Sequence, residues 1–283
     1  MGDKVQTVLF TKLFRGQGID EIGTTAAALG FDGIDLLIRR GTPLEPETPS
    51  AIPDAVRRLG REGVAVPMAT TDLTDPAAMP AERLLAACAE AGIRLIRLGY
   101  WKYDPSRGYA ACFETARRNL DALALLAAKT GIRLAIQLHG DTIHGSGAQA
   151  AALLAGHDPA LIGAYPDPGN QVVQDGREDW RFTFDILRPW LCCVGVKNGG
   201  WFPADLAPSG QRRWRSDWLG VADGMVPWDE IVAFLVETGY AGLLSFHSHY
   251  EVPLPQVLEQ TRLDLRFVQR LLGAPGPAPA RDS

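Results

Sequence analysis

One short pattern recurs along the chain: an apolar stretch, usually opened by glycine, that ends in polar residues. The clearest copy is GIRLAIQLHG. Side chains of an extended strand alternate between two faces, so Leu134, Ile136 and Leu138 share one face. Gln137 and His139 end the other face. Similar copies occur at 5–14, 30–38, 63–70, 92–99, 162–170, 191–198 and 242–250. The chain therefore requires a fold in which many strands present polar groups at their carboxyl ends.

Helical segments alternate with these eight strands. Apolar spacing and capping residues predict helices at 19–30, 53–60, 75–91, 107–130, 145–156, 178–190, 228–239 and 254–272. Eight strands that alternate with helices predict a single α/β domain, a (β/α)8 or TIM barrel, over residues 1–273. We expect 274–283, APGPAPARDS, to be a disordered tail.

The main competing fold is a doubly wound open sheet. That fold usually carries a glycine-rich phosphate loop after its first strand, and FTKLFRGQGID contains no G-x-G-x-x-G. The barrel is therefore favoured, and no nucleotide cofactor is expected. Two segments fit the barrel less well. Pro67 weakens the third strand because it has no backbone N–H, and 199–226 is a long insertion that holds three of the seven tryptophans.

Bulk composition excludes several classes of protein. A formal net charge of -5 offers no basic surface for nucleic acid. No apolar run approaches the roughly 20 residues that span a bilayer, and MGDKVQTVLF does not resemble a signal peptide. We therefore expect a cytoplasmic protein without a nucleic-acid or membrane partner. The four cysteines show no disulfide or zinc spacing, so we expect buried thiols. The oligomeric state stays open, and a homo-oligomer is compatible with the sequence.

Polar residues at the strand ends predict the functional site, because a TIM barrel collects its catalytic groups there. The predicted cluster comprises Gln137, His139, Asp167, Lys197, His247 and His249. Structural roles are the alternative: Asp167 could cap the turn at Pro168, and Lys197 could simply pair with Asp167. Arg97 and Trp101 suit sugar binding, by hydrogen bonding and ring stacking, or else belong to the core. Asp35 also faces inward, either towards the site or as a core ion-pair partner.

Several segments together resemble a known family. They are GFDGID, LAIQLHG, YPDPGN, VGVKN, LGVADGMVPWDEI and GYAGLLSFHSHY, and they extend over nearly the whole chain. The chain is similar to the xylose isomerase-like TIM barrels, the broad sugar phosphate isomerase/epimerase group. The resemblance implies a barrel that binds a small sugar or sugar derivative at its carboxyl-terminal mouth.

The ligand positions of that family are altered here. Metal-binding members typically use a glutamate on strand five, an aspartate on six, a histidine on seven and a glutamate on eight. The corresponding residues are Gln137, Asp167, Gly195 and His247, and a histidine that often follows the aspartate is Asn170. The chain therefore resembles a branch with altered ligands. If it binds a divalent metal, Gln137, Asp167 and His247 are the expected ligands, and the loss of carboxylates favours Zn²⁺ or Mn²⁺ over Mg²⁺.

The predicted function is a sugar or keto-sugar isomerase or epimerase that abstracts a proton next to a carbonyl. His139 or His247 would be the base, Lys197 or a metal would stabilise the enediolate, and Asp167 would orient its neighbours. The expected substrate-binding residues are Arg97, Trp101, Gln137, Asn170 and His249. A keto-glycoside lyase of the same fold and a non-catalytic sugar-binding or regulatory barrel are the alternatives. A metal-dependent DNA-repair nuclease shares the barrel, but the acidic composition disfavours it.

Overall fold

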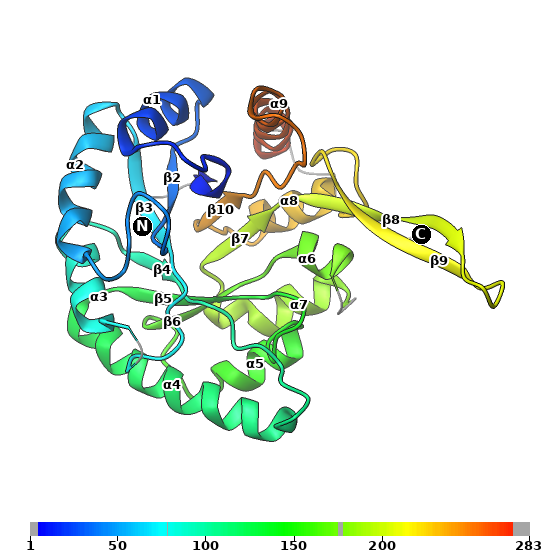
Figure 1. Ribbon diagram of the computed structural model, residues 1–283, viewed down its shortest axis with the longest axis horizontal. Coiled ribbons are helices and arrows are strands. Elements are labelled where there is room, and N and C mark those ends of the chain that lie inside the picture. Colours follow the sequence, from blue (N-terminus) through cyan, green and yellow to red (C-terminus); the bar gives the residue numbers. More distant parts are fainter. Residues whose placement is uncertain (1–4, 78, 175–177, 274–283) are drawn as a thin grey trace.

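A barrel of eight parallel strands forms the centre of the molecule (Figure 1). The computed structural model describes residues 5–77, 79–174 and 178–273, so the predicted tail at 274–283 lies outside the described residues. The strands are hydrogen-bonded in the order β6-β5-β4-β3-β2-β1-β10-β7. Their bounds are β1 Gln6–Phe10, β2 Gly33–Leu37, β3 Ala65–Thr70, β4 Leu95–Arg97, β5 Arg133–Gln137, β6 Ile162–Tyr165, β7 Cys193–Val196 and β10 Leu243–Phe246.

The two ends of this sheet meet at β6 and β7. The backbone N–H of Cys192 donates to the carbonyl of Ala164 at 3.1 Å, and the N–H of Gly195 donates to the carbonyl of Pro166 at 3.0 Å. A parallel bridge also joins Ala164 to Leu191. These contacts close the sheet, and the predicted (β/α)8 barrel is confirmed.

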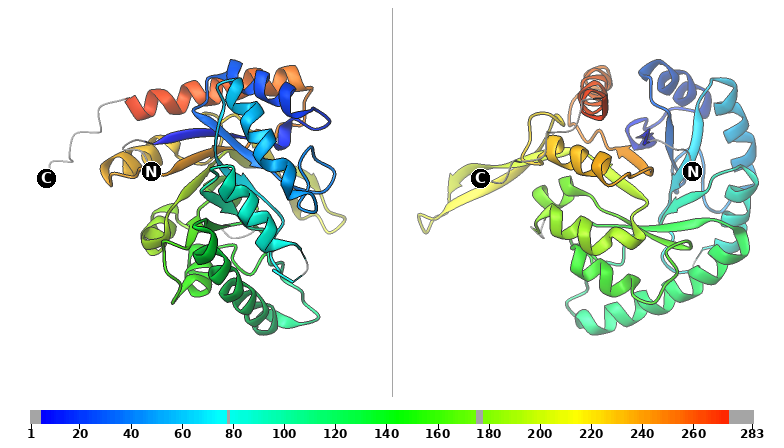
Figure 2. Two further views of the ribbon diagram at one scale, coloured as in Figure 1. Left: turned by 90° about the vertical axis from the view of Figure 1, so that its left-hand side faces the viewer. Right: turned by 180° about the vertical axis from the view of Figure 1, so that it is seen from behind.

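Helices surround the barrel on its outside (Figure 2). The two glycines that follow α1 and α4, Gly30 and Gly131, have φ values of 81° and 70°, a left-handed conformation in which glycine ends a helix without strain. The helices are α1 Ile19–Leu29, α2 Ile52–Arg61, α3 Ala81–Glu90, α4 Gly108–Thr130, α5 Gly147–Leu154, α6 Pro168–Val173, α7 Trp180–Leu187, α8 Trp228–Glu237 and α9 Leu254–Gly273. Short 3-10 turns are η1 Thr11–Leu13, η2 Pro49–Ala51 and η3 Arg188–Trp190. No helix in the described part of the chain has the length and apolar character to span a bilayer.

Two separate clusters form the core, as the alternation of strand faces predicts. Leu134, Ile136 and Leu138 pack between strands and helices in the larger cluster. The smaller cluster fills the barrel interior with Val8, Met68, Leu95, Ala135, Tyr165, Cys192, Cys193 and Leu243. All four cysteines are free and buried. The interior above this apolar layer is therefore left to the polar residues of the strand ends.

Three segments depart most from the sequence-based boundaries, and Pro67 keeps its expected place in a strand. The insertion is an antiparallel hairpin, β8 Asn198–Leu206 with β9 Arg212–Leu219, which extends away from the barrel (Figures 1 and 2). Pro67 is kept in β3 because the register with β2 shifts there, so no ladder bond needs its N–H. The predicted 75–91 helix begins only at Ala81, after Asp75 accepts a turn bond from the Ala77 N–H at 2.8 Å. Strand six ends at Tyr165, and a short helix follows.

Candidate active site

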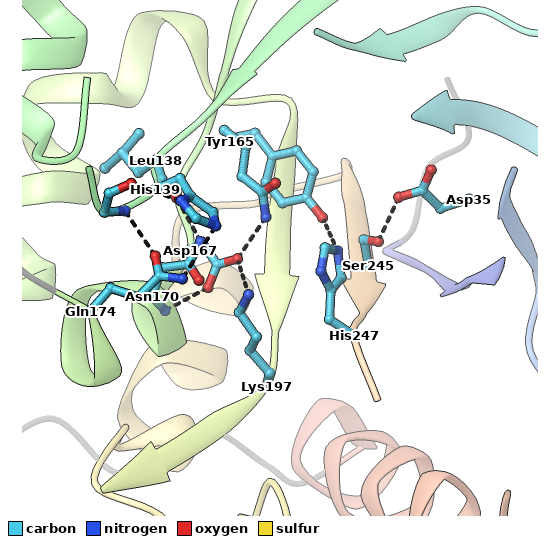
Figure 3. Close-up of polar contacts among 12 residues, drawn as sticks. Asp35, Leu138, His139, Tyr165, Asp167, Asn170, Gln174, Lys197, Ser245 and His247 are labelled. Atoms are coloured by element: carbon cyan, nitrogen blue, oxygen red, sulfur yellow. Dashed lines mark hydrogen bonds and ion pairs between the residues drawn. The ribbon is translucent and has the colours of Figure 1, made fainter. Parts of the chain in front are cut away.

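Asp167 and Lys197 form a buried ion pair at the carboxyl ends of β6 and β7. Lys197 Nζ lies 3.1 Å from Asp167 Oδ2, and their side chains are 4% and 0% exposed (Figure 3). Asp167 Oδ1 also accepts the Asn170 N–H at 2.8 Å and so caps α6. Both structural alternatives drawn from the sequence, the turn cap and the ion pair, are thus present in the same carboxylate. Burial lowers the pKa of Lys197, and the negative charge of Asp167 opposes this shift.

Gln137 holds Asp167 from the neighbouring strand. Its Nε2 donates to Asp167 Oδ2 at 2.6 Å, and its Oε1 accepts the hydroxyl of Tyr100 at 2.7 Å. Tyr100 in turn lies under the Arg97 guanidinium, whose carbon is 4.6 Å from the ring centroid. Arg97 Nη1 is buried without a hydrogen-bond partner among the described residues. A chain of contacts therefore connects the end of β4 to the Asp167–Lys197 pair.

Two glycines provide the space for this pair. A Cβ on Gly195 would lie 2.7 Å from Asp167 Oδ2, and a Cβ on Gly169 would lie 2.5 Å from Lys197 Cγ. Real Cβ atoms do not approach other atoms so closely. Gly195 occupies the position where the family resemblance expects a histidine, so in this chain that position admits the Asp167 carboxylate instead of a ligand.

His139 lies at the end of β5 with both ring nitrogens engaged. Nδ1 is 2.8 Å from the carbonyl oxygen of Gly140 and donates to it, and Nε2 accepts from the side-chain amide of Gln174 at 3.2 Å. Gln174 Oε1 accepts the Gly140 N–H at 2.8 Å, which fixes the orientation of that amide. The ring also packs on Tyr100 at 4.3 Å between centroids. Burial lowers the pKa of His139, so the imidazole is neutral and its Nε2 is the basic atom.

His247 lies at the end of β10 and contacts a tyrosine inside the barrel. The hydroxyl of Tyr165 is 2.8 Å from His247 Nε2. Burial raises the pKa of Tyr165 well above its usual value and, with nearby cations, lowers that of His247, so both groups are neutral and share one hydrogen bond. Deeper in the barrel, Ser245 donates to Asp35 Oδ2 at 3.0 Å (Figure 3). Burial raises the pKa of Asp35 to about 6. Asp35 therefore has a hydroxyl as its partner in place of a cation.

His249 lies two residues after His247, beyond the end of β10, and lines a neighbouring cavity of about 560 Å³. Its ring lies 5.6 Å from those of both His247 and Trp218. The Trp218 ring, on the hairpin, also covers the Lys197 ammonium at 4.9 Å from its centroid. Trp218 therefore forms the wall between the ion pair and the cavity.

The structure brings together most of the residues expected at the site, but Trp101 belongs elsewhere. Its ring is 7% exposed, belongs to the core between strands and helices, and lies edge-on to His144 at 5.9 Å. The aromatic ring beside Gln137 and His139 is instead that of Tyr100. Asn170 is buried, and its Nδ2 donates to the Leu138 carbonyl at 2.8 Å, so it ties β5 to α6. Sequence reasoning did not select Tyr100, Tyr165, Gln174 or Trp218.

The arrangement does not fit the divalent metal that the resemblance suggested. Asp167 is the one carboxylate at this position, and its oxygens accept from Gln137, Lys197 and a backbone N–H. Gln137 turns its amide nitrogen to Asp167, and His247 Nε2 faces the Tyr165 hydroxyl. Within the described ranges, no three His, Cys, Asp or Glu side chains are grouped to hold an ion. The ammonium of Lys197 supplies the positive charge here.

Solved structures with the same fold include two sugar epimerases. The chain superimposes on 3-keto-D-glucoside 4-epimerase from E. coli with a TM-score of 0.69 at 15% identity, over 94% of this chain and 100% of that one. It superimposes on D-psicose 3-epimerase in the presence of D-fructose with a TM-score of 0.70 at 15% identity, over 95% of this chain and 100% of that one. For a xylose isomerase-like TIM barrel protein from Mycobacterium smegmatis in complex with magnesium, the TM-score is 0.66 at 19% identity. This superposition covers 94% of this chain and 97% of that one. At such identities the similarity shows the fold.

Sequence comparison adds the family. The chain matches no curated protein. The family model for the xylose isomerase-like TIM barrel matches residues 24–271, which is most of the chain and includes every residue of the site described above. The protein therefore belongs to the xylose isomerase-like TIM barrel family.

Proposed function

We propose that this protein is a sugar or keto-sugar isomerase or epimerase that removes a proton from the carbon next to a carbonyl, with Lys197 as the electrophile. The buried Lys197–Asp167 pair, at 3.1 Å, is the observation that carries this proposal. A cation held in a water-poor site stabilises the charge that develops on an enediolate oxygen. The sugar epimerases that share the fold support a reaction of this class.

His139 is the proposed base. Its imidazole is neutral, partly exposed and oriented by the Gly140 carbonyl, with Nε2 as the acceptor. A substrate that displaces the Gln174 amide from Nε2 would place its own acidic C–H there. The proton moves to Nε2, and the electrons of the C–H bond move onto the carbonyl oxygen beside the Lys197 ammonium.

Tyr165 and His247 are the proposed second acid–base group. In the view of Figure 3 they lie on the other side of the Asp167–Lys197 pair from His139. If His139 returns the proton to the neighbouring carbon, while the hydroxyl proton of the first carbon moves to the former carbonyl oxygen and the first carbon forms the new carbonyl, the product is an isomer. If the Tyr165–His247 pair delivers a proton to the original carbon from the opposite face, the product is an epimer. In the tautomer that carries its proton on Nε2, His247 passes this proton to the Tyr165 oxygen across the 2.8 Å hydrogen bond as Tyr165 gives up its own, and takes up a proton at Nδ1. Arg97, Gln137, Asn170 and His249 are proposed to position the substrate.

Solvent exchange tests this proposal. The purified protein is incubated in D₂O with a panel of aldoses, ketoses and 3-keto sugars, and NMR follows the proton next to each carbonyl. We expect exchange or conversion of at least one sugar, and His139→Gln should slow it by about 10² or more. His157→Gln is the matched control, because His157 pairs with Asp121 away from the strand ends. A sugar that binds at saturation without exchange would favour the sugar-binding barrel instead.

A further inference from the structure

The mouth of the barrel next to the site holds three cations that form no ion pair with another described residue. Lys12 lies in η1 directly after β1, and Arg15 follows it; neither forms an ion pair within the described ranges. Arg97 is buried and equally without a carboxylate partner there, and its Nη1 has no hydrogen bond. The chain as a whole carries a net charge of -5. The positive charge is thus a local feature of the mouth.

The pKa of Lys12 also indicates an excess of positive charge around this side chain. Its side chain is partly buried, and its pKa is lowered by burial and by the positive charges of Arg39, Arg15, Lys197 and Arg97. The same sign of charge acts on His249, whose pKa burial and the nearby cations lower to about 2. The largest charge effects at both residues come from cations.

Lys12, Arg15 and His249 line one cavity beside the ion pair. Trp218 also belongs to its wall, and its volume of about 560 Å³ is within the usual range for small-molecule sites. Glu251 is the acidic residue among its described lining residues, so two basic side chains face one carboxylate. The buried His249 Nε2 has no hydrogen-bond partner among the described residues and is free to form one with a substrate hydroxyl.

From this geometry we propose that the cavity binds an anionic group of the substrate, a carboxylate or a phosphate, through Lys12 and Arg15. The substrate class is then an acidic keto-sugar, whose carbonyl reaches Lys197 while its anionic end remains in the cavity. Trp218 contacts both regions, since its ring lies 4.9 Å from Lys197 Nζ and 5.6 Å from the His249 ring. This inference rests on the proposed function for the position of the carbonyl.

Binding measurements test the inference without requiring turnover. Calorimetry compares D-fructose, D-fructuronate and D-fructose 6-phosphate at low salt, with the His139→Gln protein used so that turnover is slow during the measurement. We expect at least one acidic sugar to bind about tenfold or more tightly than fructose, and higher salt should reduce this difference. The order of the two acidic sugars identifies the carboxylate or the phosphate as the group recognised.

Two sets of variants test whether Lys12 and Arg15 cause the preference for the acidic sugar. Lys12→Gln combined with Arg15→Gln should remove the preference for the acidic sugar and leave fructose affinity within about twofold. Arg94→Gln removes one exposed cation from the residues before β4, at the other end of the barrel, and should change neither. Equal affinity for neutral and acidic sugars, or a preference that survives loss of Lys12 and Arg15, would overturn the inference. Because exchange in D₂O is measured separately, failure of the catalytic proposal would leave an intact anion preference, and the two failures can be told apart.

Discussion

Lys197 Nζ and Asp167 Oδ2 lie 3.1 Å apart with almost no exposure to solvent, at the ends of two strands that close the barrel. A buried pair of this kind contributes little net stability when intact, but loss of one partner leaves an uncompensated charge in a low-dielectric interior. The pair is therefore both a structural constraint on the mouth and the source of the positive charge that we assign to catalysis.

A double-mutant cycle should show this coupling. Asp167→Asn alone, which leaves the Lys197 ammonium unpaired, should lower the free energy of unfolding by about 3–5 kcal/mol. Lys197→Met alone should also destabilise the protein, because Asp167 then keeps only its N–H donors. The double variant should be more stable than the sum of the single effects predicts. Urea unfolding measures all four proteins, and strictly additive effects would contradict strong coupling.

Gly195 should not tolerate a side chain. Gly195→Ala places a Cβ 2.7 Å from Asp167 Oδ2, so the carboxylate must move and its contact with Lys197 must lengthen. We expect loss of sugar exchange by an order of magnitude or more. Gly60→Ala is the control, because a Cβ there, within α2, meets no atom within 4 Å, and helix propensity favours alanine. Full exchange activity in Gly195→Ala would show that the position of Asp167 is unimportant.

Asp35 should make the protein less stable as the pH rises. Its pKa is about 6 in the folded protein and 3.8 without the barrel around it, so the folded state binds the extra proton between these values. Stability from this group is complete below about pH 3.8 and is lost as the pH rises through 6. Asp35→Asn keeps an acceptor for Ser245 and should become more stable than wild type by up to about 3 kcal/mol above pH 6, with little difference near pH 4. A gain that does not depend on pH would contradict the shift.

The donor set at Asp167 leads to a prediction about metal content. Protein purified without chelator should hold far less than one divalent ion per chain, and EDTA should leave sugar exchange unchanged. Elemental analysis paired with the exchange assay checks both statements. A stoichiometric ion whose removal abolishes exchange, and whose return restores it, would show that Asp167 leaves Lys197 to bind metal.

Strand faces explain why the centre of the site could be predicted from the sequence. Gln137, Asp167, Lys197 and His247 each occupy an inward position at a strand end, and the alternation of apolar residues fixes that face regardless of distant contacts. The structure brings Gln137, Asp167 and Lys197 into direct contact. The barrel itself followed from the same pattern.

The contacts of residues that lie outside the strands could not be predicted from the alternation of strand faces. Trp101 follows β4 in a loop, where nothing in the sequence distinguishes a ring at the mouth from one in the core. Gln174 contacts His139 from the end of α6, a short helix that was expected to be strand. Tyr165 ends β6, but its partner His247 is 82 residues away in the chain, so no local pattern connects the two. The hairpin did leave a signal, since PSG lies between two stretches of mixed apolar and polar residues.

The most direct test of the central claim is the rate of solvent-deuterium exchange in Lys197→Met, measured beside wild type with an exchanging sugar and EDTA present. Stopped samples are analysed by NMR for deuterium at the carbon next to the carbonyl, and thermal unfolding confirms that the variant is folded at the assay temperature. If the Lys197 ammonium stabilises the enediolate, the variant should exchange at least about 10²-fold more slowly than wild type. Exchange at the wild-type rate in folded Lys197→Met would contradict the account.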